Sequence, residues 1–368
     1  MCRPPGNLRL RNLRAPSLFP MNMRRPASPS SNPFLRLLAA ASLLLLLCAA
    51  ILAAGAAGAS HGPSAHRSGS RGPAYMTGMG DEADQMFGNK LFLNLHTKIA
   101  RYITPYNTAV KSRSLKWARE WIADAEAAHM KILIAFYHSE HPPMNLPSAA
   151  TYKRDVAKFI KYFPRVREYQ AWDEDNRGYV YDGNASFASP TAVQTAQYYQ
   201  ALKRDCTRCT VLGLDVLDQD NPYPTLQYIA EFKYEVNRLH APMPSIWGLH
   251  NYSDINRFQS WRTRAIVKAM GGQVWLTETG GIVKFAGEFN NKHGSGVRRA
   301  AKVLKYMFGV AGAVSQIKRL YIYDWTGGNA STRFDAGLMN AHEKPREGYV
   351  TVCNALRGSG CRVRTVEN

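Results

Sequence analysis

Two glutamates, Glu174 and Glu278, lie where the sequence could support acid–base or nucleophilic chemistry. Each follows directly after a short apolar segment typical of a β-strand, and each has charged or aromatic neighbours. A single glutamate in a loop is usually a solvated side chain. Two opposed carboxyl groups can instead cleave a glycosidic bond, since one protonates the leaving oxygen while the other attacks the anomeric carbon or activates water. The pair therefore predicts glycoside cleavage, with retention of configuration if the fold brings the two groups to within ~5–5.5 Å.

The elements that must position this pair alternate along the chain from about residue 73. Short apolar segments at 74–78, 99–104, 131–137, 166–172, 210–216, 245–249, 273–277 and 319–323 predict strands. Segments with helical spacing at 115–129, 148–162, 192–204, 224–239, 256–270, 296–313 and 342–356 predict the helices between them. Eight such units are typical of a (β/α)8 TIM barrel, a single α/β domain. A doubly wound open sheet is the alternative, but acidic Asp81 and Glu82 follow the first strand, where a phosphate-binding turn would need glycines.

Catalytic and binding groups of a barrel gather at the carboxyl ends of its strands. At these positions the sequence places polar, charged and aromatic side chains instead of simple turn residues. We expect the following to bind substrate: Arg101, His138, Trp172, Asp173, Asn176, His250, Tyr252 and Trp325. His138, His141 and His250 could also be read as metal ligands with Glu140, but no pair of histidines lies at ligand spacing on one helix, which favours subsite hydrogen bonds or surface positions. The acidic cluster Asp215, Asp218 and Asp220 could bind calcium, but it lacks the glycine and terminal glutamate of a calcium loop, which favours a polar rim or substrate contact.

Two of these strand ends resemble motifs of the clan A glycoside hydrolases. Trp172-Asp173-Glu174-Asp175-Asn176 resembles their Trp-Asn-Glu-Pro-Asn element, and the segment around Glu278 (275–280) resembles their strand-seven nucleophile element. The order of strand ends extends the resemblance from about Arg101 to Trp325. It implies a TIM barrel and a retaining β-glycosidase mechanism, with Glu174 as acid/base and Glu278 as nucleophile.

The resemblance also implies roles for neighbouring residues. Tyr252 would hydrogen-bond the nucleophile, and Arg101 would lie beneath it and hold it ionised, because an opposite charge lowers a carboxyl pKa. His138 and His250 would line the subsite next to the scissile bond. Trp325 would stack on a sugar face, and Trp172 is a further candidate for such a platform.

One position departs from the clan pattern. The clan has Asn before the acid/base, and that Asn donates a hydrogen bond to the sugar 2-hydroxyl; an ionised Asp173 has no proton to donate. Asp173 and Asp175 also flank Glu174 with negative charge, which we expect to raise its pKa and suit a general acid. The departure leaves a second hypothesis open, a non-catalytic glycan-binding barrel at the cell envelope.

The formal charge of +20 is concentrated towards the N-terminus, where nine arginines precede the first acidic residue, Asp81. Removing them leaves +11 for the rest of the chain. An apolar run at 35–57 follows most of these arginines and ends in small residues, which predicts either a signal peptide over 1–59, cleaved after Ala59, or a retained membrane anchor. A linker at 60–72 and the barrel domain at 73–368 would follow. Both interpretations place the barrel outside the cytoplasm, secreted or anchored, and an anchored structural protein is a third, weaker hypothesis.

Four cysteines outside the leader form two local pairs. Outside the cytoplasm this predicts disulfides Cys206–Cys209 and Cys353–Cys361 in preference to a redox or zinc site. No metal or other cofactor is expected. The expected partner is an oligo- or polysaccharide. Nucleic acid is not expected as a partner outside the cytoplasm and without a recognition motif. The sequence leaves the sugar, the linkage, endo or exo action and the oligomeric state open.

Overall fold

The computed structural model describes residues 75–139, 146–178, 180–181, 186–285, 296–329 and 331–367. The expected signal or anchor segment and the linker after it lie outside these residues, as do His141 and its neighbour Glu140. None of the helices in the described ranges is long and apolar enough to cross a membrane.

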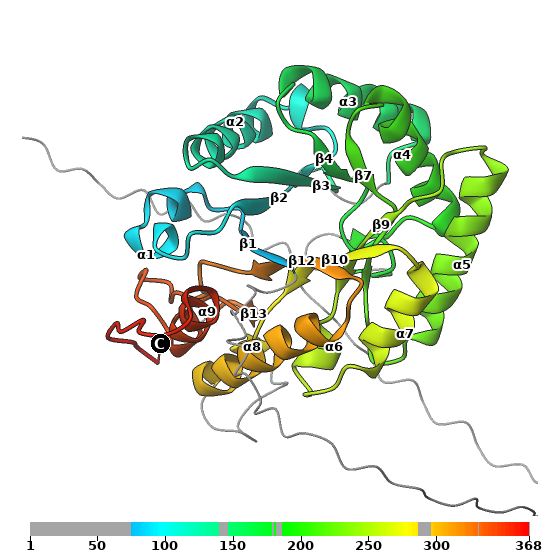
Figure 1. Ribbon diagram of the computed structural model, residues 1–368. Helices are drawn as coiled ribbons and strands as arrows, with labels where there is room; N and C mark the ends of the chain where they lie inside the picture. The colour runs from blue at the N-terminus through cyan, green and yellow to red at the C-terminus, as the bar shows by residue number, and fades with distance from the viewer. Residues whose placement is uncertain are drawn as a thin grey trace, which may run out of the picture. The chain divides into compact units, whose positions relative to one another are not determined.

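A sheet of parallel strands forms the centre of the fold (Figure 1). Its members are β1 (Met76–Gly80), β2 (Ile99–Pro105), β3 (Lys131–Tyr137), β4 (Glu168–Gln170), β7 (Thr210–Leu212), β8 (Asp215–Leu217), β9 (Ile246–His250), β10 (Gln273–Thr279) and β12 (Ile317–Tyr323). They lie in the order β7-β4-β3-β2-β1-β12-β10-β9-β8. Two short antiparallel pairs are separate from this sheet: β5 (Val180–Tyr181) with β6 (Ser186–Phe187), and β11 (Lys284–Phe285) with β13 (Phe334–Asp335).

The two edge strands of the sheet, β7 and β8, are halves of one chain segment interrupted at Gly213 and Leu214. The first half pairs with β4 and the second half pairs with β9. Both residues of the interruption bind β9: the Gly213 amide donates to the Ile246 carbonyl (2.9 Å), and the Leu214 carbonyl accepts from the Gly248 amide (2.7 Å). This segment thus closes the sheet into a ring of eight strand positions, and the fold is the predicted (β/α)8 barrel.

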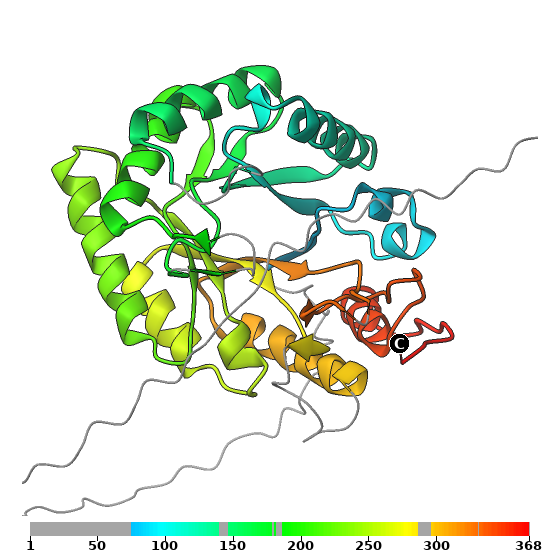
Figure 2. The ribbon, with the colours of Figure 1, turned by 180° about the vertical axis from the view of Figure 1, so that it is seen from behind.

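Helices surround this ring in both views (Figures 1 and 2). They are α1 (Lys90–Leu93), α2 (Ser112–Ala127), α3 (Ala149–Tyr162), α4 (Ala192–Asp205), α5 (Tyr223–Arg238), α6 (Tyr252–Ile255), α7 (Trp261–Met270), α8 (Gly296–Ala313) and α9 (Glu347–Arg357), with 3₁₀ turns η1 (Asp84–Gly88) and η2 (Thr108–Val110). The helix expected at 256–270 is shorter, since α7 begins at Trp261 and the preceding α6 is a separate turn.

Local sequence explains where several elements begin. α4 starts at a capping box, in which the Thr191 hydroxyl accepts from the Gln194 amide and the Gln194 side chain accepts from the Thr191 amide. α3 starts at Ser148, whose hydroxyl accepts from the Thr151 amide. In β3 every residue after Lys131 is buried, as expected for a parallel strand covered on both faces.

A small cluster of apolar side chains fills one layer of the barrel. It consists of Ile99, Leu133, Leu212, Trp275 and Tyr321, each from a different strand. Side chains two positions along a strand point the same way, so Arg101 lies one layer further towards the carboxyl ends than Ile99, as does Thr277 relative to Trp275. An apolar layer therefore supports the charged groups that follow it.

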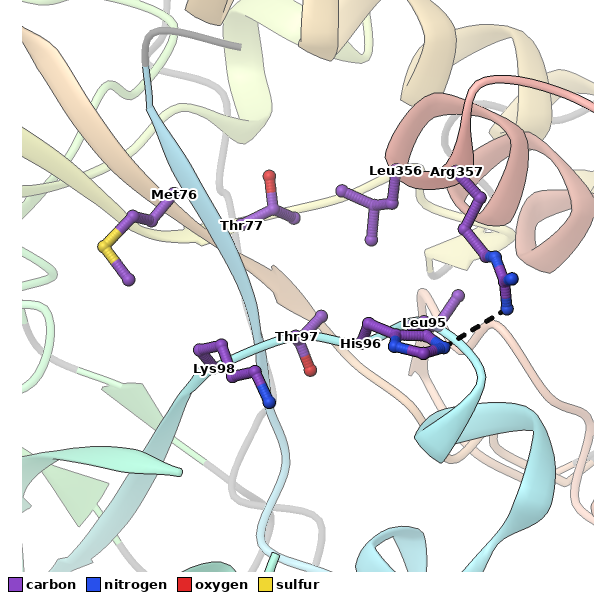
Figure 3. A pocket seen from close by; sticks show the side chains of 8 residues that line it. All are labelled: Met76, Thr77, Leu95, His96, Thr97, Lys98, Leu356 and Arg357. Carbon is purple, nitrogen blue, oxygen red and sulfur yellow. Dashed lines mark hydrogen bonds between the residues drawn. The ribbon is translucent and has the colours of Figure 1, made fainter. Parts of the chain in front are cut away.

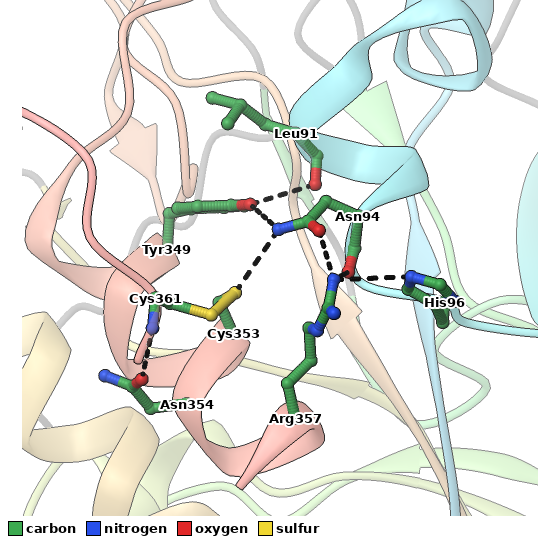
Figure 4. The surroundings of a disulfide bond; sticks show 8 residues. All are labelled: Leu91, Asn94, His96, Tyr349, Cys353, Asn354, Arg357 and Cys361. Atoms are coloured by element: carbon green, nitrogen blue, oxygen red, sulfur yellow. Dashed lines mark hydrogen bonds between the residues drawn. A yellow bond between two sulfur atoms is a disulfide. The ribbon is translucent and has the colours of Figure 1, made fainter. Parts of the chain in front are cut away.

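Both expected disulfides are present, Cys206–Cys209 after α4 and Cys353–Cys361 at the C-terminus. The second joins α9 to the segment that follows it (Figure 4). Near it, the Arg357 guanidinium donates to the Asn94 carbonyl (3.0 Å) and the Tyr349 hydroxyl donates to the Leu91 carbonyl (3.0 Å). The C-terminal helix is thus attached to the segment between β1 and β2.

A cavity of about 430 Å³ opens at the amino ends of the first two strands (Figure 3). Its lining comes from the start of β1, the turn before β2 and the end of α9: Met76, Thr77, Leu95, His96, Thr97, Lys98, Leu356 and Arg357. It lies at the opposite end of the strands from Glu278, so it is separate from the site described next.

Candidate active site

Arg101 on β2 joins side chains from several strand ends. Its Nε donates to Gln170 Oε1 at 2.7 Å and its Nη1 donates to Glu278 Oε1 at 2.7 Å. Its Nη2 donates to both Asp173 Oδ1 (2.5 Å) and Asp215 Oδ2 (2.8 Å). The guanidinium is fully buried, and a fork of fixed donors can hold several carboxyl groups in one plane. Arg101 therefore positions three acidic side chains from β10, β8 and the loop after β4.

Glu174 and Glu278 are brought together at the carboxyl ends of β4 and β10. One carboxylate oxygen of each and a ring nitrogen of His250 lie within 4.8 Å of one another. A nearest-oxygen separation below 4.8 Å is compatible with the ~5–5.5 Å between the carboxyl groups of retaining glycosidases, and is shorter than the ~6.5–9.5 Å of inverting pairs. Glu174 also has a φ of +52°, an uncommon backbone conformation that tends to occur at functional sites.

Three side chains contact the carboxylate of Glu278. Arg101 binds one oxygen, while the Tyr252 hydroxyl donates to the other at 3.3 Å. His250 Nδ1 lies 3.6 Å from that second oxygen and 3.3 Å from Glu174 Oε1. The structure thus places Arg101, Tyr252 and His250 around the glutamates where the sequence predicted them, and adds His250 as a bridge between the two.

The protonation of the two glutamates differs from what the sequence predicted. Burial raises the pKa of Glu174, but contacts with Arg177 (2.7 Å) and His250 outweigh burial, so the pKa is lowered and not raised. Burial raises the pKa of Glu278, and the negative charges of Glu174 and Asp215 raise it further. The positive charges of His250 and Arg101 lower it, but the net shift is upward. Arg101 alone therefore does not keep Glu278 ionised. The pKa of Glu174 depends mainly on Arg177, a residue that the sequence did not point to.

Asp215, on β8, was read from the sequence only as part of an acidic rim. It accepts from Arg101, from His250 Nε2 at 3.1 Å and from the Thr277 hydroxyl. Burial raises its pKa, but His250 and Arg101 outweigh burial and lower it to about 2. Burial disfavours the charged form of His250, but Asp215 and Glu278 outweigh that and raise its pKa well above the usual value. Asp215 therefore holds His250 in its charged form between the two glutamates.

The two tryptophans proposed as sugar platforms are buried. Trp172 is fully buried, with its ring against Tyr137, His138 and Tyr198. Trp325 is 2% exposed and packs edge-on against Phe92 and Tyr349. Neither ring has an open face in this structure, so the assignment of stacking roles to them is wrong for the state described. The sequence placed both at strand ends but could not show which way their rings turn.

Two other expected substrate contacts have structural partners. Asn176 donates to the Leu217 carbonyl (3.0 Å) and the Thr225 hydroxyl (2.7 Å), and accepts from the Leu217 amide (2.8 Å). It therefore ties the loop after β4 to the end of β8. His138 is 4% exposed and lies against Trp172 at the end of β3.

Two further carboxyl groups that the sequence analysis did not assign lie near the pair. Glu82, after β1, accepts from the Tyr323 hydroxyl at 3.1 Å, and its charge and that of Glu278 repel. Asp324 follows β12. Burial raises the pKa of both carboxyl groups well above the usual range. They were missed because nothing in their spacing distinguishes them from ordinary loop residues.

Two groups of side chains have the geometry of cation ligands. They are Asp173, Asp215 and His250, and Glu174, His250 and Glu278, each with one ligand atom apiece within 4.8 Å. In both groups the acidic oxygens already pair with Arg101, Arg177 or His250. The donor set therefore fits a charge network better than a cation site.

Comparison with known proteins gives matches at the level of structure only. No protein-family profile and no curated protein sequence matches the chain. Among solved structures, the native xylanase 10B of Thermotoga maritima is 12% identical, with a TM-score of 0.52 over 77% of this chain and 95% of that one. At this identity the match shows a shared fold, the (β/α)8 barrel.

Two further solved structures share this fold. The family 1 β-glucosidase of Thermotoga maritima is 10% identical, with a TM-score of 0.53 over 78% of this chain and 99% of that one. The GH5_18 protein of Streptomyces cattleya, solved in complex with GlcNAc, is 12% identical, with a TM-score of 0.54 over 78% and 80%. Identities this low show a shared fold, and they do not identify a substrate for this chain.

Proposed function

We propose that the protein is a retaining O-glycoside hydrolase acting on a β-linked glycan, with Glu278 as nucleophile and Glu174 as acid/base. The observation that carries this proposal is that one carboxylate oxygen of Glu174 lies within 4.8 Å of one carboxylate oxygen of Glu278 at the carboxyl ends of the barrel strands. Glu278 attacks the anomeric carbon while Glu174 protonates the leaving oxygen, and Glu174 then removes a proton from the water that releases the sugar.

The contacts of Glu278 suit a nucleophile. Arg101 and Tyr252 each hold one of its oxygens, which fixes the carboxylate for attack. The contacts of Glu174 do not yet suit an acid, because Arg177 favours its ionised form. The proposal therefore includes a rearrangement in which an entering glycan separates Arg177 from Glu174.

The decisive experiment is trapping of the covalent intermediate with activated 2-deoxy-2-fluoro aryl glycosides of glucose and xylose, followed by peptide mass spectrometry. We expect the label on Glu278. A label on Glu174 would reverse the two roles, and the electrostatics of the sugar-free site make that a specific alternative. Failure of every activated aryl glycoside to react or label would reject the hydrolase.

Substitutions test the same assignment. Glu278→Gln and Glu174→Gln should each lower hydrolysis of activated aryl glycosides by about a thousandfold, because each removes a group that acts in the transition state. Glu120→Gln, on the exposed surface of α2, is the matched control and should keep wild-type rates. Wild-type rates in Glu278→Gln would contradict the mechanism.

A non-catalytic glycan-binding barrel is the second candidate. The ion pair between Arg177 and Glu174 favours it, because a glutamate held ionised cannot donate a proton. It predicts that a polysaccharide binds without turnover and that Glu174→Gln leaves this affinity unchanged.

We also propose that the barrel is exported, as the leader predicted, and that it is secreted or remains anchored at the envelope. The two local disulfides support export, because such bonds persist in oxidising compartments.

A further inference from the structure

Asp173 differs from the other carboxyl groups of the site in how its two oxygens are used. It is fully buried, and its amide donates to the Phe136 carbonyl at 2.8 Å. Oδ1 accepts from Arg101 Nη2, whereas Oδ2 has no hydrogen-bond partner among the described residues. A buried polar atom without a partner is costly, and such an atom beside two candidate catalytic groups points to a bound ligand.

The charges that directly pair in the site do not balance if every carboxyl group is ionised. Three cationic groups, Arg101, Arg177 and His250, are in contact with four carboxyl groups: Asp173, Glu174, Asp215 and Glu278. One carboxyl group therefore lacks a counter-charge. In a buried site such a group is expected to hold a proton.

Of the four carboxyl groups, Asp173 has the fewest contacts with a positive charge or a second donor. Asp215 contacts both Arg101 and His250, and Glu174 contacts both Arg177 and His250. Glu278 contacts Arg101 and also accepts from Tyr252. Asp173 shares one nitrogen of Arg101 with Asp215 and has no second donor.

The groups that face Asp173 from the surrounding elements lead to the same assignment. Burial raises its pKa most, Glu278 and Glu174 add to the rise, and Arg101 and His250 oppose it, so the pKa is raised to about 8. The remaining titratable neighbours whose electrostatics involve Asp173 are Tyr137 on β3, and Asp175 and Arg177 on its own loop.

We propose that Asp173 is a neutral carboxylic acid in the sugar-free protein, and that its Oδ2–H group is the hydrogen-bond donor offered to a sugar held between Glu174 and Glu278. The donor half of this inference rests on the proposed function. A neutral acid can donate where a carboxylate can only accept, so the aspartate is a pH-dependent donor at this position. The preferred ligand is a neutral sugar with a hydroxyl or acetamido oxygen facing Asp173, and not a protonated amino sugar.

The protonation can be measured without any sugar. We expect the infrared difference spectrum of full-length wild type minus Asp173→Asn, at about pH 6, to contain the carbonyl band of a protonated carboxylic acid, and to lose it above about pH 10. Other buried carboxyl groups are common to both proteins and cancel. A carboxylate band in its place at about pH 6 would overturn the inference.

Asp175→Asn is the matched control. Asp175 is the same residue type on the same loop, and both its oxygens have partners, the Thr195 hydroxyl (3.1 Å) and the Asp215 amide (2.7 Å). The band assigned to Asp173 should persist in this variant. If Asp173→Asn does not fold, the same difference spectrum is recorded against Asp173→Ser, and the absence of the protonated-acid band at about pH 6 would overturn the inference.

The donor role is tested by calorimetry with xylobiose, cellobiose and N-acetylglucosamine. For any of them that binds, affinity of the wild type should fall about tenfold from about pH 6 to about pH 10, whereas Asp173→Asn, which keeps a donor at every pH, should fall less. Equal pH dependence in the two proteins would overturn the donor role. Binding of none of the three would overturn the donor role together with the proposed function, while the infrared result would still decide the protonation.

Discussion

Arg177 is the side chain that most strongly opposes the effect of burial on the pKa of Glu174, the proposed acid/base. It lies three residues after Glu174, is almost fully buried and contacts Glu174 Oε2 at 2.7 Å. The favourable charge keeps Glu174 ionised in the absence of a glycan. A general acid must instead be protonated when the substrate arrives.

Replacing Arg177 with Leu should therefore raise the pKa of Glu174, since the burial that raises it loses its main opposing charge. Because the acid is active only when protonated, the alkaline limb of kcat/KM should move to higher pH. Rates of an activated aryl glycoside against pH measure this. Lys116→Leu, which removes an exposed ion pair with Glu120 on α2, should leave the profile in place. An unmoved profile in Arg177→Leu would show that Arg177 does not control the pKa of Glu174.

Asp173 gives a stability that depends on pH. Its pKa is raised to about 8 in the folded protein, mainly by burial, so the folded state retains a proton that the unfolded chain loses near pH 4. The resulting stability is fully present below about pH 4 and is lost as the pH rises through about 8, at no more than about 1.4 kcal/mol per pH unit. Urea unfolding should show wild type losing stability relative to Asp173→Asn over this range. A difference that is constant with pH would contradict it.

At this scale the sequence predicted which residues meet, including the contacts of Arg101 and Tyr252 with Glu278, but not the protonation of the carboxyl groups. Glu174, Glu278, Arg101, Tyr252 and His250 come together as expected, because strand-end positions converge in any barrel. The order of the two glutamate pKa values could not be predicted, since it depends on Arg177 and on the distances of a buried charge network. Ring orientations, as at Trp172, are likewise set by packing and not by position in sequence.

β1 approaches β2 closely through a glycine. A Cβ atom on Gly78 would lie 2.2 Å from the Ile99 carbonyl oxygen, which is backbone and cannot rotate away. Gly78→Ala should therefore destabilise the barrel by about 1–3 kcal/mol. Gly309, inside α8, has open space around it, so Gly309→Ala should stabilise by about 0.5–1 kcal/mol. Chemical denaturation of both variants checks the pair, and equal effects would contradict the close-packing argument.

The sequence predicted most elements because their hydrophobic periodicity is strong. β3 matches its expected range, and α3 and α4 each differ by one residue at one end. The strand expected at 210–216 is instead divided into β7 and β8. The apolar pattern continues through Gly213, so periodicity could not show that the partner strand changes there.

The whole chain combines a basic balance with an acidic centre. Of the formal +20, nine charges lie before Asp81, whereas the candidate active site has more acidic than basic groups. The positive net charge of the chain therefore gives no reason to expect that an acidic glycan binds at the candidate active site. The arginines before Asp81 relate instead to the proposed export.

The proposed export predicts where the mature chain begins. If the leader is a signal peptide, the protein recovered from the secreted fraction of its source should begin at Ser60, because cleavage follows the small residues that end at Ala59. N-terminal sequencing with intact-mass analysis checks this. A chain that keeps residues 35–57 and partitions with membranes would support the anchor, and a chain kept in the cytoplasm would reject export.

The division of the strand at Gly213 and Leu214 also separates the protein into two complementary halves. The amino-terminal half supplies Arg101 and Glu174, and the carboxyl-terminal half supplies Asp215, His250 and Glu278. Each half alone holds an incomplete set of charges, and Arg101 finds two of its carboxylate partners only across the junction. The charge network can therefore form only when the two halves close the ring. Co-expressed fragments divided at this point should form the site only when they associate with each other.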